Sequence, residues 1–489
     1  MANNRKVYPI WDNEIVDFDN TTASFSVATP QKKECVFVAD KEWEGGVVND
    51  PNVIEDDGKY KMYYLAHYHP YKVESKNGHI KGTTIAIINT FICYAESDDG
   101  LTWTKPNLRI CEYNGSVENN IILRSQDKPE EGGFFDNFFV FKDTNPNCEP
   151  ERRYKALAYS NLYKLSSYVS ADGLNFKLEN IFDIPGKFDT LNVCYFDERI
   201  NKYVAYVRDF HNVPEGDLNA GIRDVRRTES SDFINWSTPE LITFIDSEDY
   251  PLYTNNISRY YRNTNLLIGF PTRYVERKEW TDNFERLTAK EVRLEKMKIH
   301  KRHGLTITDC IFMVSHDGKR WYKYDEALFT PEREHGGNWS YGCCYPAYFM
   351  LETPADDGIN TDLSMFMPIN YSPIDSEQTP EKLCRYVFRR DGFAYYSGKY
   401  TGQTFVTNEF LFDGDYLEIN FSTSARGNMF VTITSEDGEV AKTCELFGDN
   451  DSRRIDFIDN DLAIFKGKKV KLHFEMRDAK LYSFAVCKN

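Results

Sequence analysis

The 489-residue sequence has no long apolar run and carries fewer positive than negative charges. No stretch approaches the ~20 apolar residues that a membrane-spanning helix requires. The first residues, Met1 to Lys6, lead into no apolar segment of a signal peptide. The formal net charge of -17 argues against a nucleic-acid partner, because phosphates would be repelled. We therefore expect a soluble, cytoplasmic protein without a membrane or nucleic-acid partner.

The cysteine and histidine residues also lack the sequence spacing that is typical of a metal site. The eleven cysteines are odd in number, no Cys-x-x-Cys pair occurs, and the nine histidines show no ligand spacing. The simplest interpretation is free thiols in a reducing compartment. We expect no metal and no cofactor.

What the sequence does contain is a recurring turn, in which Ser is followed by Asp, usually Gly, and then an aromatic residue. It occurs at residues 97–103, 170–176, 230–236 and 315–321, with a weaker copy at 389–395. Asp-Gly supplies the positive φ angles of a tight hairpin turn. A repeat of roughly 60 to 85 residues indicates five units, each the size of a four-stranded propeller blade.

The runs between these turns are rich in β-branched and aromatic residues, which is typical of strands. After about Gly398 the strands alternate without the aromatic turn, which indicates a β-sandwich. We therefore expect an all-β protein. Its predicted parts are a lead-in segment packing on the propeller (1–44), a five-bladed β-propeller (45–398) and a β-sandwich (399–489).

One charged insertion, Glu276 to Arg302, interrupts the fourth unit with residues that favour a helix. The simplest interpretation is a solvated surface helix or helical hairpin. A lid over a pocket and a contact in a homo-oligomer are the alternatives.

Three predicted inner strands begin with an aspartate, at Asp50, Asp136 and Asp189. Inner strands of a propeller enter the central channel at one end, so these carboxylates would converge on one pocket. Neighbouring carboxylates raise each other's pKa. A protonated carboxyl beside an ionised one is what a glycosidase needs, since one protonates the leaving oxygen while the other attacks or activates water. The alternative is that each Asp only caps a turn.

A sugar site also needs flat apolar faces and groups that hydrogen-bond hydroxyls. Most of the 32 Tyr and 34 Phe must serve packing. The candidates at channel-entry positions are Trp43, Glu44, His67, Arg208, Tyr253, Asn255, Arg273, Trp339 and Tyr341.

The first unit resembles a known family of enzymes. Asn49-Asp50-Pro51-Asn52, followed by Asp57-Gly58-Lys59-Tyr60, resembles the first blade of the five-bladed glycosidases, in the invertase/inulinase and arabinanase/xylosidase groups. Trp43-Glu44 and segments 189–193, 203–208, 337–339 and 474–484 resemble a bacterial glycosidase-like group with a C-terminal β-sandwich. The turn also resembles the Asp-box of sialidases, a structural turn that does not identify a substrate.

The resemblance implies one catalytic carboxylate on each of blades one, two and three. Asp50 would be nucleophile or general base, Asp136 the transition-state stabiliser and Asp189 the general acid. Two departures stand out: Asn137 replaces the Pro of the invertase pattern, and Asp189 stands where the characterised enzymes use Glu. Glu332, Glu334 and Glu44 are alternative acids.

The resulting expectation is a glycosidase that hydrolyses an oligosaccharide or glycoside, furanosides included. A glycoside phosphorylase on the same ring and a non-catalytic carbohydrate-binding propeller are the alternatives.

Overall fold

The computed structural model describes residues 4–66, 72–76, 79–84, 90–125, 137–159, 164–215, 220–245, 247–288, 290–335, 338–369, 380–458 and 460–489. Asp136 and His67 lie outside these residues. No helix in the described part of the chain is long and apolar enough to span a membrane.

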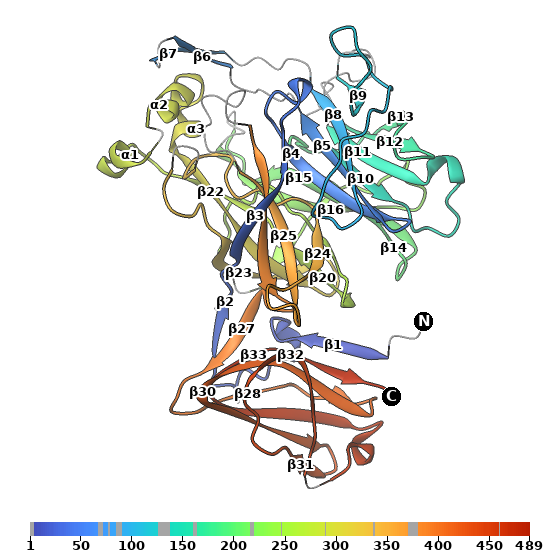
Figure 1. Cartoon of the computed structure of the whole chain (residues 1–489), viewed down its shortest axis with the longest axis vertical. Coiled ribbons are helices and arrows are strands. Elements are labelled where there is room, and N and C mark those ends of the chain that lie inside the picture. Colours follow the sequence, from blue (N-terminus) through green and yellow to red (C-terminus); the bar gives the residue numbers. More distant parts are fainter. Residues whose placement is uncertain are drawn as a thin grey trace.

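Three four-stranded antiparallel sheets, formed by consecutive segments of the chain, are the first three blades (Figure 1). Blade 1 contains β4 (Asn49–Asp56), β5 (Lys59–Ala66), β8 (Phe91–Ser97) and β9 (Ile121–Arg124); blade 2 contains β10 (Asn137–Lys142), β11 (Tyr154–Tyr159), β12 (Leu165–Ser170) and β13 (Lys177–Ile181); blade 3 contains β14 (Val193–Asp197), β15 (Lys202–His211), β16 (Ile222–Ser230) and β17 (Glu240–Leu241).

Two further sheets complete the ring, so the expected five-bladed propeller is confirmed. Blade 4 contains β18 (Thr243–Phe244), β19 (Ser258–Tyr260), β20 (Asn263–Gly269), β21 (Thr272–Glu276), β22 (Thr306–Ser315) and β23 (Arg320–Phe329); blade 5 contains β24 (Met350–Pro354), β25 (Thr361–Ile369), β26 (Lys382–Arg389) and β3 (Gln31–Val38). An N-terminal strand is therefore the outer strand of the last blade and closes the ring.

The recurring turn has one hydrogen-bond pattern in its first four copies. In the first, the Ser97 hydroxyl donates to Asp99 and accepts from the backbone N–H of Gly100, while Asp99 Oδ1 accepts from the N–H groups of Leu101 and Thr102. Burial opposes ionisation, but these donors outweigh it and lower the pKa of Asp99 to about 2. The third copy has Phe233 in place of glycine, at a φ of 66°.

The fifth copy is not this turn. Asp391 is fully buried and accepts hydrogen bonds from Tyr260 and Arg262 of blade 4 and from Ser483 of the C-terminal sheet. Its backbone carbonyl accepts from the Trp11 indole. The expected repeat is thus replaced by a junction between the propeller and the C-terminal part.

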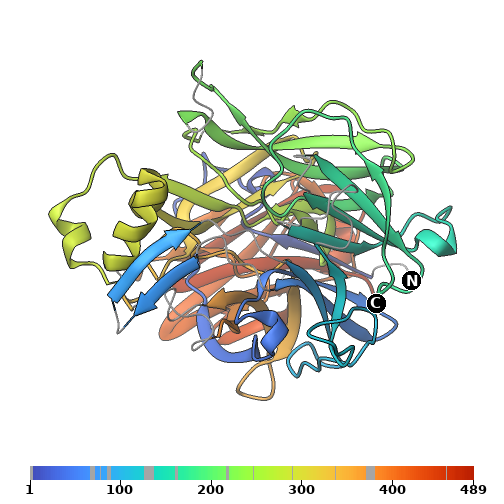
Figure 2. The ribbon, with the colours of Figure 1, turned by 90° about the horizontal axis from the view of Figure 1, so that it is seen from above.

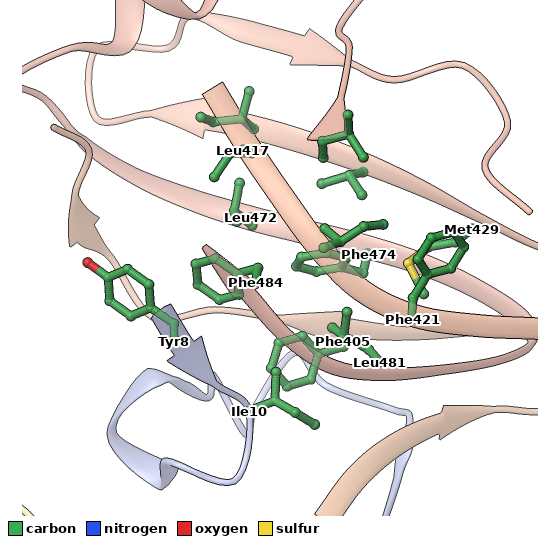
Figure 3. Close-up of a cluster of buried hydrophobic side chains, with 14 of the residues drawn as sticks. Tyr8, Ile10, Phe405, Leu417, Phe421, Met429, Leu472, Phe474, Leu481 and Phe484 are labelled. Atoms are coloured by element: carbon green, nitrogen blue, oxygen red, sulfur yellow. The ribbon is translucent and has the colours of Figure 1, made fainter. Parts of the chain in front are cut away.

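The C-terminal part is a nine-stranded sheet that wraps around its own core. Its strands are β1 (Arg5–Pro9), β2 (Ser24–Val27), β27 (Ala394–Gly398), β28 (Gln403–Val406), β29 (Phe410–Leu411), β30 (Tyr416–Ser435), β31 (Val440–Lys442), β32 (Asp449–Ile455) and β33 (Lys469–Cys487). Tyr8 and Ile10 lie in this core with Phe405, Phe474 and Phe484 (Figure 3).

The segment expected to be an irregular lead-in therefore divides its strands between two sheets. β1 pairs with β33 and β2 pairs with β27, whereas β3 pairs with β26 of blade 5. Pairing partners more than 300 residues away leave no signal in the local sequence, which is why these strands were not expected.

The insertion in blade 4 forms three helices, α1 (Asp282–Arg286), α2 (Lys290–Ile299) and α3 (Lys301–Leu305). They lie beside the β6–β7 hairpin (Lys72–Lys76 and His79–Thr84) of blade 1, at the end of the propeller away from the C-terminal sheet (Figures 1 and 2). Short 3-10 turns occupy Asn13–Ile15, Glu42–Glu44, Pro150–Arg152 and Leu462–Phe465.

The expectation of free thiols is wrong for one pair. Cys35 of β3 and Cys384 of β26 form a disulfide. Closure of the ring aligns two strands that are 349 residues apart, so no spacing rule could have identified the pair.

Candidate functional site

Asp50 lies at the start of the inner strand of blade 1, in an unusual backbone conformation. Its φ is 45°, and the β4–β5 register shifts between Asn49 and Asn52. Such a bulge redirects a side chain, and aspartate is among the residues that tolerate a positive φ. The side chain is half-buried.

Asp189 precedes the inner strand of blade 3 and forms an ion pair with Arg208 of β15. The Asp189 carboxylate is 45% exposed, whereas Arg208 is buried. Arg208 Nη1 also donates to the Lys187 carbonyl at 3.3 Å. The guanidinium lies over the Tyr253 ring, 5.2 Å from its centroid. The pair leaves Asp189 accessible while its cation is fixed.

Four tyrosines, which we call the tyrosine cluster, connect these two aspartates: Tyr253, Tyr274, Tyr341 and Tyr345. The Tyr253 hydroxyl donates to the Asp189 carbonyl at 3.1 Å, and the Tyr341 hydroxyl donates to Tyr253 at 3.2 Å. The Tyr253 and Tyr345 ring centroids are 5.7 Å apart.

Asp50 is in electrostatic contact with the same cluster. Burial raises the pKa of Tyr345 well above its ordinary value, and neighbouring groups including Asp50 raise it further. Asp189, Arg208, Tyr253 and Tyr341, four residues singled out in the sequence, thus lie together, and Asp50 lies near enough to act on Tyr345.

Two hydroxyl groups of the tyrosine cluster lack a hydrogen-bond partner among the described residues. The hydroxyls of Tyr274 and Tyr345 are buried and have no hydrogen-bond partner within the part of the chain that the structure describes. A buried hydroxyl without a partner costs free energy. A bound ligand or water could satisfy both groups.

The helical insertion contacts this cluster, in contrast to a purely solvated helix. The His303 ring of α3 stacks on Tyr341, with centroids 5.3 Å apart and an interplanar angle of 15°. Arg293 of α2 is buried and donates to the backbone carbonyls of Asn338 and Trp339. The insertion therefore packs against the site rather than away from it.

His303 gives a prediction about acid stability. Burial, reinforced by Arg302 and His300, lowers the pKa of His303 from 6.5 to about 3. The unfolded chain therefore binds a proton that the folded chain does not, so this group lowers stability as the pH falls from 6.5 towards 3. His303→Phe keeps a stacked ring without titration. We expect a smaller drop in melting temperature between neutral and mildly acidic buffer; equal drops in both proteins would contradict this.

Arg273 and Trp339 lie in a neighbouring cavity between blades 3 and 4. Arg273 forms a two-point ion pair with Asp309, at 2.9 and 2.7 Å. The Trp339 indole donates to the Glu332 carbonyl at 2.8 Å. Both side chains line the cavity but have their polar groups engaged within the protein.

Three other candidates have structural contacts. Glu44 is fully buried and accepts from Tyr64 (2.5 Å), Lys105 (2.7 Å) and the Lys41 backbone. Trp43 donates to Asn120 at 2.7 Å. Asn255 is buried, with its amide bonded to backbone groups of Tyr206 and Ile257. These contacts join the segment before β4 to blade 1, and blade 3 to blade 4, so the three residues have structural roles.

The structure also shows the contacts of two alternative acids, Glu332 and Glu334. Glu332 accepts from Lys32 at 2.9 Å and from Tyr386 at 2.5 Å. Glu334 is exposed, in the loop before Asn338, and interacts electrostatically with Arg293. No contact of either residue with the tyrosine cluster is found among the described residues.

Sequence reasoning missed Tyr274, Tyr345, His303 and Arg223. Tyr345 begins the strand-like run 345–351, which the sequence indicates as the inner strand of blade 5, so the rule that selected the aspartates would have found it. His303 and Arg223 gave no such signal, because an insertion and a middle strand bring them to the site. Within the described residues, no three of His, Cys, Asp and Glu are placed to hold a metal ion.

Comparisons with known proteins find no family and only distant structural likenesses. No family model and no curated protein matches the sequence. Similar solved structures include an N-acetylgalactosamine deacetylase from F. plautii in complex with blood group B trisaccharide (9% identity, 76% of this chain and 95% of that chain, TM-score 0.41). Others are an exo-beta-1,3-galactanase from Phanerochaete chrysosporium with galactose (8%, 90% and 96%, 0.38) and a beta-fructofuranosidase from Bombyx mori (10%, 90% and 91%, 0.37). At these values the likenesses carry no conclusion about family or activity, and the fold assignment rests on the sheet topology.

Proposed function

We propose that the protein is a glycoside hydrolase acting on a short oligosaccharide or glycoside, furanosides included. The observation that supports the proposal is that two aspartates interact with one tyrosine cluster: Tyr253 donates to the Asp189 carbonyl, and Asp50 acts electrostatically on Tyr345. Two carboxylates beside flat aromatic faces suit a sugar, because the rings can stack on it while the acids act on the glycosidic bond.

In this proposal Asp50 is the nucleophile or general base, since it lies on the inner strand and interacts with Tyr345, whose hydroxyl is buried. Asp189 is the second carboxylate. Its ion pair with Arg208 favours the charged form, whereas a general acid must start the reaction protonated. A substrate that engages Arg208 would release Asp189 for the acid role that the glycosidase resemblance implies.

The test is a panel of aryl furanosides, aryl pyranosides and short oligosaccharides, assayed by release of the aglycone or of a new reducing end. We expect hydrolysis of at least one class without added phosphate. Turnover that requires phosphate would favour a phosphorylase instead. Sugar binding without turnover of any glycoside would favour a carbohydrate-binding propeller, and both outcomes would contradict the proposal.

A further inference from the structure

A cavity of about 640 Å³ lies between blades 3 and 4, beside the tyrosine cluster. Its lining includes Arg223 of β16, Tyr250, and Arg273 and Tyr274 of β21. Tyr274 belongs to both places, because its ring centroid lies 6.2 Å from that of Tyr253 and 5.7 Å from that of Tyr341. A ligand in this cavity would therefore lie next to the candidate catalytic residues.

Arg223 is the unusual group in this cavity. It is only 4% exposed, and its guanidinium has no hydrogen-bond or ion-pair partner among the residues that the structure describes. Its guanidinium carbon lies over two aromatic rings, 3.9 Å from the Tyr274 centroid and 5.2 Å from that of Phe210. These rings support the cation but do not neutralise it.

Three other arginines near the site have a carboxylate partner. Arg208 is paired with Asp189, Arg273 with Asp309, and Arg226, three residues beyond Arg223 on β16, with Asp224. A buried charge is costly unless it is paired. Among the described residues Arg223 lacks this compensation, which a bound anion would supply.

The remaining lining agrees with an anionic occupant. Three arginines line the cavity against the two carboxylates of Glu276 and Asp309, an excess of one positive charge. The buried Tyr274 hydroxyl supplies a further donor that has no partner in the described part of the chain. A guanidinium and a hydroxyl together match the oxygens of a carboxylate or phosphate.

We infer that this cavity binds an oxyanion through Arg223 and Tyr274, either the carboxylate of an acidic sugar or inorganic phosphate. The inference rests on the proposed function, which it deepens. A carboxylate there would make the substrate an acidic glycoside, whereas phosphate would be a second ligand beside the cleaved bond.

Binding to the full-length protein can be measured without turnover, by titration calorimetry with glucuronate, galacturonate and phosphate. Glucose and galactose are the neutral references. We expect at least one anion to bind at least tenfold more tightly than the neutral sugars. Arg223→Met should weaken that binding by roughly 10- to 100-fold, as loss of a charged hydrogen bond does, and Tyr274→Phe should weaken it less. The exposed Arg320→Met removes the same charge outside the cavity and should change nothing.

Stability supplies the second readout. Because Arg223 is an unpaired buried cation, Arg223→Met should leave the melting temperature of the ligand-free protein unchanged or raise it. Absence of Arg223-dependent anion binding would overturn the inference, and so would a drop of several degrees in the melting temperature of this variant.

The same titrations identify the ligand. Binding of a uronate alone identifies an acidic sugar, and binding of phosphate alone identifies phosphate. Hydrolysis with no anion binding would overturn only this inference, whereas Arg223-dependent binding with no hydrolysis would overturn only the proposed function.

Discussion

Asp50→Asn lowers the turnover number by roughly 10²- to 10⁴-fold, the range expected when a positioned catalytic group is removed. The neutral amide cannot attack the sugar or accept a proton from water. Asparagine tolerates the φ of 45° at this position as aspartate does, so the melting temperature should not change. The measurement is kcat and KM on the best glycoside of the panel.

The matched control for this variant lies at the other end of the same hairpin. Asp57 has a φ of 52° and is exposed in the β4–β5 turn. Asp57→Asn makes the same chemical change in the same backbone conformation and should leave kcat unchanged. If Asp50→Asn keeps wild-type turnover on a confirmed substrate, Asp50 is not a catalytic residue.

Asp391→Ala destabilises the protein by about 3–5 kcal/mol, the range for removing one partner of a buried ion pair. Asp391 is fully buried, and Arg262 Nε donates to it at 2.8 Å. The Ser483 hydroxyl also donates to it at 2.8 Å. The substitution leaves a mostly buried Arg262 without this carboxylate and removes a link between propeller and C-terminal sheet.

Trp11 reports on this junction, since its indole donates to the Asp391 carbonyl at 2.8 Å. Urea unfolding followed by tryptophan fluorescence should show a lower midpoint for Asp391→Ala. The control is Asp413→Ala, which breaks the exposed ion pair with Lys488 and should cost less than about 1 kcal/mol. Equal midpoints for the two variants would show that the junction does not stabilise the fold.

The local sequence predicted the propeller because each blade repeats its own signals. The Ser-Asp-Gly turn forms its hydrogen bonds within six residues, so Ser97 and Asp99 identify it without any tertiary information. Asp391 shows the limit of this approach. Its sequence resembles the same turn, but its side chain is bound by residues about 90 to 130 positions away, which no local pattern encodes.

Part of the candidate site was predictable from the positions at which inner strands start. Asp50 and Tyr253 were found because ring closure brings equivalent strand positions together. Asn255 met the same rule but has structural contacts, since the start of an inner strand also needs buried hydrogen bonds. Arg223 could not be found, because only the packed structure shows that its charge is buried and unpaired.

The most direct test is the crystal structure of Asp50→Asn with an uncleaved glycoside of the class that the wild-type protein hydrolyses. We predict that the sugar stacks on the tyrosine cluster with its glycosidic oxygen between Asn at position 50 and Asp189. The separation of these side chains should fall within the ~5–9.5 Å that glycosidases use. A glycoside bound elsewhere, or two side chains too far apart to reach one glycosidic bond, would contradict the account.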